Sequence, residues 1–284
     1  MHLFQTDDDS PMRLPAFRLY VGALVLGTLA IQIQTVTIAW QVFDITKSNH
    51  ANAALALGAV GLAEVIPFVS SVLFAGHVAD KNNRRFIACT SLTVMLLLSL
   101  LLFLPSLIAT SWLKLCLLYG VVIGGGLARS FLTTARQAMI AEILQRSQIP
   151  SAVRWRNTLF ELSSVIGPGF AGLLIWLNGE YLAYSVSSIL FIAALLNNLS
   201  IKTSHELQSR QPEPILQSLR TGIHFMLSQR AMLGAFTLDL FAVLFGGAVA
   251  LLPIFAEMLN VGPLGFGLLR AATSCGAVIM SIYL

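Results

Sequence analysis

The chain has 284 residues, of which 56% are hydrophobic and only 11% are charged, and its formal net charge is +4. Its mean hydropathy of +0.80 is well above that of a water-soluble domain. This composition excludes a soluble globular domain and predicts a membrane protein, which we expect to be all-α because its apolar segments are long enough for membrane-spanning helices.

Three segments contain no Asp, Glu, Lys or Arg and are long enough for the roughly 20 residues that cross a bilayer. They lie between Arg18 and Asp44, between Arg85 and Lys114, and between Glu180 and Lys202. Five more reach a similar length when one interior charge is allowed: 51–75 with Glu64, 115–138 with Arg129, 155–178 with Glu161, 231–256 with Asp239, and 263–284 with Arg270. The sequence therefore predicts eight membrane-spanning helices.

The distribution of Lys and Arg predicts the orientation, because cytoplasmic loops carry an excess of positive charge. Basic residues gather before the first predicted span and after the second, fourth and sixth, whereas the alternate loops hold only Lys47 and Lys114. We therefore expect a multi-pass protein of the cell (inner) membrane with a cytoplasmic N-terminus. The bases are spread over separate loops without an aromatic platform, so they do not indicate nucleic-acid binding.

Four regions are predicted along the chain: a cytoplasmic tail at 1–16, a six-helix bundle at 17–200, a cytoplasmic linker at 201–230 and a partial second bundle at 231–284. The linker is polar and contains Pro212 and Pro214. Apolar residues recur in it at helical spacing, which favours an amphipathic helix on the inner membrane face, with a plain linker as the alternative.

The connection after the second predicted span reads GHVADKNNRR and concentrates charge in a chain that otherwise avoids it. Its pattern is G-x-x-x-D-K-x-x-R-R, formed by Gly76, Asp80, Lys81, Arg84 and Arg85. An ordinary positive loop would explain the bases but not the glycine and the acid. The pattern resembles the loop-two signature of the major facilitator superfamily in residue types and in location. The resemblance implies a close helix approach at Gly76, a hydrogen-bonding or helix-terminus partner for Asp80, and bases that hold the loop at the interface.

The fifth predicted span contains SSVIGPGFAGLL, in which the residues of interest are Ser163, Gly167, Pro168, Ala171 and Gly172. Small residues flatten a helix face and a proline bends it, so this segment can pack against a partner helix and shift along it. Ordinary helix packing would use the same residues. The pattern is similar to the G-x-x-x-G-P-x-x-G-G motif of facilitator antiporters, with Ser163 and Ala171 in two of its glycine places.

A longer stretch, ARQAMIAEILQRSQIPSAVRWRNTLFELSSVIGPGFAGLL, resembles the branch of that superfamily that includes enterobactin-type siderophore exporters and macrolide efflux pumps. The resemblance implies a major facilitator-type helical bundle with a six-helix N-terminal half and about two helices of the C-terminal half, apparently truncated after the eighth helix. One family feature is absent: Gly120 stands four residues before Gly124, where an arginine is expected early in the fourth helix.

Ionisable residues inside the spans are candidates for the mechanism, because a charge at mid-membrane is costly and faces protein, water or a counter-charge. These candidates are Glu64, Arg129, Glu161, Asp239 and Arg270. Arg129 and Glu161 lie at similar depths in neighbouring spans, so we expect them to pair, with Glu64 able to join. Desolvation favours a neutral carboxyl and an arginine favours a charged one, which is the balance a proton-coupling residue needs. A static ion pair that only holds helices together is an equal alternative.

Polar and aromatic residues of the first span, Gln32, Gln34 and Trp40, are candidates to line a cavity for an amphipathic substrate, although core or interface positions suit them equally. We find no nucleophile–base pair and no ligand spacing among His and Cys, so we expect no enzyme, no cofactor and no metal site.

The favoured hypothesis is a secondary transporter that exchanges protons for a small amphipathic compound, a drug or a siderophore, by rocking two helix bundles about a central cavity. Its partners would be that substrate, protons and the lipid bilayer, while the oligomeric state stays open. The alternative is a non-transporting, truncated membrane fragment or an accessory helix bundle.

Overall fold

The computed structural model describes residues 11–201, 229, 233–234, 237–238 and 247–283. The helices within these ranges are α1 Pro15–Thr46, α2 His50–Lys81, α3 Arg84–Leu101, α4 Ser111–Ile143, α5 Ile149–Ser200, α8 Leu252–Met258 and α9 Gly262–Tyr283. Short 3-10 turns are η1 Pro11–Arg13, η2 Leu104–Leu107, η3 Arg146–Gln148 and η4 Gly247–Leu251. All elements of the described residues are helical, which confirms the predicted all-α fold.

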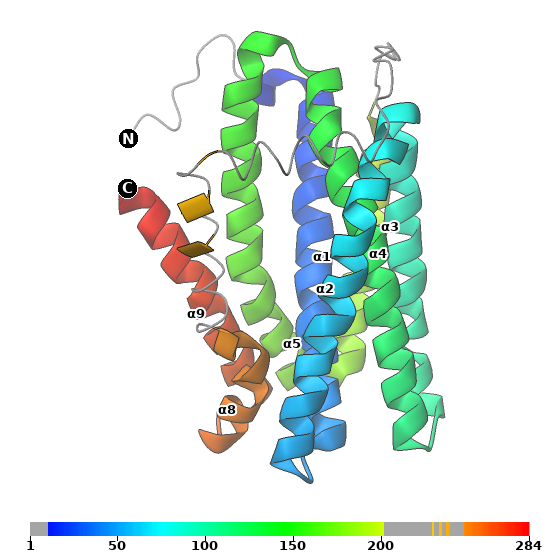
Figure 1. Cartoon of the computed structure of the whole chain (residues 1–284), viewed down its shortest axis with the longest axis vertical. Helices are drawn as coiled ribbons and strands as arrows, with labels where there is room; N and C mark the ends of the chain where they lie inside the picture. The colour runs from blue at the N-terminus through cyan, green and yellow to red at the C-terminus, as the bar shows by residue number, and fades with distance from the viewer. Residues whose placement is uncertain (1–10, 202–228, 230–232, 235–236, 239–246, 284) are drawn as a thin grey trace.

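The long helices run side by side along the longest axis of the molecule (Figure 1). Among the described residues, α1 to α5 provide five helices that are long and apolar enough to cross a membrane. The N-termini of α2 and α3 are capped by asparagines: Asn49 accepts a hydrogen bond from Ala51 N, and Asn83 accepts one from Phe86 N. Such caps satisfy backbone donors that a helix start leaves unpaired.

The helix α5 is interrupted by a turn at Asn178 and Gly179. A straight helix of its 52 residues would be about 78 Å long, far beyond the roughly 30 Å of a hydrocarbon core. Both residues leave helical dihedrals, and Gly179 has φ 73° and ψ −172°, a conformation that is essentially restricted to glycine. The chain therefore descends through 149–177, in green, and returns through 180–200, in yellow-green (Figure 1). These two runs are the fifth and sixth predicted spans.

Basic residues gather at one end of the bundle, at the top of Figure 1, where α1 begins and the α2–α3 and α4–α5 connections lie. We call it the basic end, and it carries Lys81, Arg84, Arg85, Arg146 and Arg154. The other end, which we call the opposite end, carries the α1–α2 connection and the break in α5. The outer faces of α2 and α3 expose apolar side chains such as Leu62 and Leu97, as expected of helices that face lipid.

The core consists of two apolar clusters with α1 at the centre. The cluster toward the opposite end includes Trp40, Phe43 and Phe266. The cluster toward the basic end includes Phe17 and Phe191. Of the five candidate spans, α1 has the largest buried share, 61% of its most apolar window, because other helices surround it.

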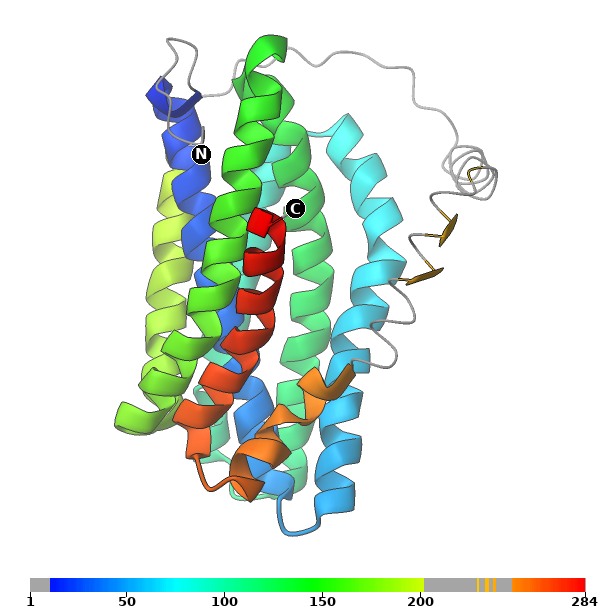
Figure 2. The same ribbon diagram turned by 90° about the vertical axis from the view of Figure 1, so that its left-hand side faces the viewer.

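The C-terminal part of the chain is described only in pieces. Of the predicted linker at 201–230, the structure describes only Ile201 and Gln229, and Asp239 also lies outside the described residues. The predicted span 231–256 is described continuously only from η4 onward, whereas the predicted span 263–284 corresponds to α9. In both views α9, in red, lies beside the green run of α5 (Figures 1 and 2).

Candidate functional site

The helices α2 and α4 pack in parallel, both running from the opposite end to the basic end. The Tyr119 hydroxyl donates to Ala56 O over 2.9 Å, and the hydroxyls of Ser71 and Ser130 are 2.6 Å apart. Between these contacts lies Gly126, where a Cβ atom would be only 2.5 Å from the carbonyl oxygen of Glu64. A glycine here lets the two backbones touch at Glu64.

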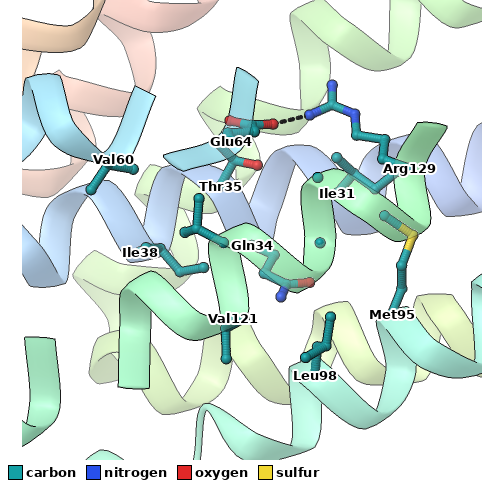
Figure 3. Close-up of a pocket in the computed structure, with 13 residues that line it drawn as sticks. Ile31, Gln34, Thr35, Ile38, Val60, Glu64, Met95, Leu98, Val121 and Arg129 are labelled. Atoms are coloured by element: carbon teal, nitrogen blue, oxygen red, sulfur yellow. Dashed lines mark hydrogen bonds and ion pairs between the residues drawn. The ribbon is translucent and has the colours of Figure 1, made fainter. Parts of the chain in front are cut away.

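This close approach positions an ion pair. Arg129 lies one turn after Gly126 on the same face of α4, and its Nη1 donates to Glu64 Oε1 on α2 (Figure 3). The Arg129 and Glu64 side chains are 31% and 27% exposed, so a small molecule or water can reach them. The expected pairing of Arg129 with Glu161 is wrong. Contact at Gly126 brings Arg129 to α2, whereas Glu161 is exposed on α5.

A third charge, from the C-terminal part of the chain, interacts with this pair without forming an ion pair with Glu64 in the part of the chain that the structure describes. Arg270 of α9 is partly buried and interacts electrostatically with both Glu64 and Arg129. We call Glu64, Arg129 and Arg270 the central charge cluster. It brings together three of the five ionisable candidates from three helices that are far apart in sequence, and its formal charge is one positive unit.

A small cavity of about 40 Å³ adjoins the ion pair between α1, α2, α3 and α4. Its walls are mostly apolar, with Gln34 and Thr35 as polar residues beside Glu64 and Arg129 (Figure 3). This volume holds on the order of three water molecules, each of which needs roughly 10–15 Å³. The polar groups at hand supply the hydrogen bonds that such waters require.

Of the three cavity candidates from the first span, only Gln34 lines this cavity. Gln32 packs against α5, because its Cβ is 2.5 Å from where a Cβ of Gly167 would lie. Trp40 stacks on Phe266 of α9 with ring centroids 5.9 Å apart. Gln32 and Trp40 therefore lie at helix interfaces, which was the alternative to a cavity-lining role in the sequence analysis.

The glycine-rich motif of α5 forms a backbone contact with α9. A Cβ on Gly172 would be 2.6 Å from Pro263 O and 2.9 Å from Gly267 Cα. A Cβ on Gly267 would be 2.5 Å from Pro168 O. The motif residues Ser163 and Ala171 are also buried, and helical dihedrals continue through Pro168. The small face predicted for this span thus packs against a partner helix.

Two arginines of the GHVADKNNRR loop, at the start of α3, contact neighbouring helices at the basic end. Arg84 forms an ion pair with Glu142 at 3.2 Å and donates to Ala138 O at 3.1 Å, both on α4. Arg85 donates to the carbonyl of Leu199 on α5. These two bases therefore join helices in addition to any role at the interface.

Two other expectations for this loop, a close helix approach at Gly76 and a partner for Asp80, are not met among the described residues, whereas the interface role of Lys81 stays a prediction. A Cβ on Gly76 would have nothing described within 4 Å, so the expected close helix approach is absent there. Asp80 and Lys81 are exposed. Within the described ranges, the Asp80 carboxylate has neither a hydrogen-bond partner nor an ion-pair partner.

Glu161 lies in a second and larger cleft, of about 560 Å³, between α2, α4 and α5 toward the basic end. Sequence reasoning missed the polar residues that share this cleft, and it missed Gly126 and Gly267. The run of three glycines at 124–126 was the available signal for the α2–α4 contact, because consecutive small residues in a span mark close packing.

We predict that Gly126→Ala separates α2 from α4 and weakens the Glu64–Arg129 pair. The new methyl group would meet a backbone carbonyl, which cannot turn away as a side chain can, so the free energy of unfolding should fall by about 1–3 kcal/mol. Thermal unfolding in detergent, followed by circular dichroism, measures the change. Gly120→Ala is the control, because a Cβ there has nothing described within 4 Å. Equal stability of the two variants would contradict the close approach.

The fold is that of a multi-pass membrane protein, and ionisable residues from separate helices lie together between those helices. This combination is typical of membrane transporters. Residues 7–284 match the model of a family described as transmembrane secretion effector. The chain therefore belongs to this family of the major facilitator superfamily, which is a superfamily of transporters and not of enzymes.

The chain is also similar to a curated protein in sequence and to a solved structure in fold. A region of 159 residues, 53% of this chain, is 28% identical to Multidrug resistance protein 2 of Bacillus subtilis (strain 168) and covers 38% of that protein's length. The fold is similar to the crystal structure of a D-xylose-proton symporter, with a TM-score of 0.63 and 12% identity over 94% of this chain and 68% of the other. The resemblance to the siderophore-exporter and macrolide-efflux branch, and truncation after the eighth helix, stay predictions.

Proposed function

We propose that the protein is a secondary active transporter that expels a small amphipathic compound, a drug or a siderophore, from the cell in exchange for protons. The observation that carries the proposal is the Glu64–Arg129 pair with Arg270 of α9 beside it. The name of the Bacillus subtilis relative, a multidrug resistance protein, supports a drug-like substrate.

The charges of the central cluster support the proposed proton coupling. While Glu64 is ionised it offsets one of the two arginines, and the cluster carries one net positive charge. If Glu64 binds a proton, the net charge of the cluster becomes two positive units. Arg129 and Arg270 then repel each other without a compensating carboxylate. Arg270 belongs to α9, and the repulsion therefore favours an arrangement in which α9 lies farther from α2 and α4. Binding of a proton thus shifts the balance between two helix arrangements.

Proteoliposomes that contain the purified chain and a trapped pH-sensitive dye test this function. With a pH gradient imposed, addition of ethidium or of a catecholate siderophore should release protons at a rate that saturates with substrate. The compound that elicits the flux identifies the substrate class. Absence of flux with every compound would favour the alternative, a non-transporting fragment or accessory bundle in which the ion pair only joins helices.

The charge distribution also supports a cytoplasmic location for the basic end in the inner membrane, with the tail 1–16 and the linker 201–230 on the same side. We predict that a thiol placed by Asn82→Cys reacts with a membrane-impermeant maleimide only in everted vesicles. A thiol placed by Ser48→Cys should react only in intact cells. Both are introduced after Cys89, Cys116 and Cys275 are changed to serine. The reverse labelling pattern would invert the orientation.

A further inference from the structure

The cleft between α2, α4 and α5 has the size and lining of a binding site for a small molecule. Its volume of about 560 Å³ falls within the range of ligand pockets, roughly 300–1,000 Å³. Thr133, Thr134 and Gln137 line it from α4, and Asn157 lines it from α5. Phe160 adds an aromatic wall. Polar groups therefore converge beside an apolar surface.

Arg156 supplies the cleft with a cation that has an unused hydrogen-bond donor. Its Nε atom is buried and has no hydrogen-bond partner among the described residues. Although Glu161 lines the same cleft, the structure shows no ion pair of either residue within the described ranges. A buried, unpaired donor on a guanidinium is costly, and an anionic acceptor removes that cost.

A second arginine, Arg136, interacts with Arg156 and packs against α1. Arg136 is only 6% exposed, donates to Ala23 O over 2.8 Å, and lies against Gly27, where a Cβ would be 2.6 Å from Nη2. The Tyr20 hydroxyl donates to Arg136 O over 3.0 Å and is also hydrogen-bonded to the Arg156 side chain, whose Nε atom stays without a partner among the described residues. Arg136 and Arg156 repel each other. Two like charges are thus held together by backbone and hydroxyl groups, a situation that an anion between or beside them stabilises.

We propose that this cleft binds the anionic head group of an amphipathic molecule, with Arg156 as its direct ligand and Arg136 reinforcing the positive potential. The hydroxyls and amides of α4 and α5 donate to the remaining oxygens of the head group, and Phe160 packs against the apolar portion. The inference deepens the proposed function, because the identification of the ligand as an exported compound rests on it. A carboxylate, sulfonate or phosphate satisfies the same chemistry, whether from a soluble compound or from a lipid of the adjacent leaflet.

Fluorescence titration of the purified chain in dodecyl maltoside tests the site. Dansylglycine carries a carboxylate, and dansylglycinamide is its neutral counterpart. Dansylglycine should bind Arg156→Gln at least about 10-fold more weakly than the unaltered chain, because the variant loses the charge-assisted hydrogen bond of the guanidinium. The amide should bind both alike. Arg154→Gln is the matched control, an exposed arginine two residues earlier, and should bind dansylglycine normally.

Arg156→Lys protects the test against misfolding, because it keeps the charge without the Nε donor and should therefore bind dansylglycine more weakly than the unaltered chain but more tightly than Arg156→Gln, while size-exclusion profiles confirm folding of each variant. Equal affinity of the unaltered chain for the acid and the amide would overturn the proposal. So would equal weakening by Arg154→Gln and Arg156→Gln.

A competition experiment assigns the source of the anion. If phosphatidylglycerol, but not phosphatidylcholine, displaces dansylglycine from the unaltered chain, the occupant is a lipid head group. If neither lipid displaces it, the occupant is a soluble compound. Both outcomes support the anion site. The titration uses no pH gradient, so failure of proton flux with intact, Arg156-dependent binding would overturn the proposed function alone.

Discussion

Glu64→Gln should reduce substrate-driven proton flux in proteoliposomes to the level of empty vesicles. Glutamine keeps the size and the hydrogen-bonding oxygen of the side chain but cannot carry the proton that the proposed coupling requires. Asp44→Asn is the matched control, because Asp44 is an exposed acid at the end of α1, paired with Lys47, and its loss should leave the flux unchanged.

The cost in stability should be small enough for this measurement to report on transport. Removing one partner of a fully buried ion pair costs about 3–5 kcal/mol, but these side chains are 27% and 31% exposed, which lowers the expected cost to about 1–2 kcal/mol. The double variant Glu64→Gln with Arg129→Gln removes both charges and should recover part of this loss. If the double variant also recovered transport, the pair would be a structural link and not the coupling group.

The second large effect concerns the contact between α5 and α9. Gly172→Ala and Gly267→Ala each place a methyl group against backbone atoms at 2.5–2.9 Å, and neither helix can yield without moving as a whole. We expect each to lower the free energy of unfolding by about 1–3 kcal/mol and to move Arg270 away from Glu64. Thermal unfolding measures the first effect, and loss of proton flux measures the second.

Gly169→Ala serves as the control on the same helix, because its Cβ would meet only Ala271 Cβ, at 4.0 Å. It should be neutral or stabilising by about 0.5–1 kcal/mol, the usual gain of alanine over glycine within a helix. In the double variant Gly172→Ala with Gly267→Ala, the two losses should not add, since one methyl group already displaces α9. Additive losses would mean that the two glycines act at separate contacts.

The sequence predicted which segments form helices better than it predicted which residues of different helices contact one another. The loop after the second span, the turn near Gly179 and the spans within 15–200 all follow from charge-free runs and from the residues that interrupt them. The pairing of Arg129 was predicted with the wrong carboxylate. Depth in the membrane could be estimated for Glu64 and Glu161 alike, but depth does not say which helix faces Arg129.

Other assignments failed for a similar reason. Gly76 was expected at a close helix contact and has open space among the described residues, whereas Gly126 and Gly267, which received no such role, make backbone contacts. A glycine permits close approach but does not cause it. The neighbour must also present a flat surface at the same height, and that depends on how two helices are rotated and tilted.

Composition and local pattern alone establish that this chain spans a membrane as helices, that it carries a basic loop between two of them, and which few charges lie inside them. These properties are local, because hydrophobicity and charge act on each segment whatever its neighbours are. Only the tertiary structure brings Glu64 to Arg129, packs α9 against α5 and places Arg136 near Arg156, which lines one cleft. Each of these contacts depends on the relative rotation of helices distant in sequence, which is decided by the packing of the whole bundle.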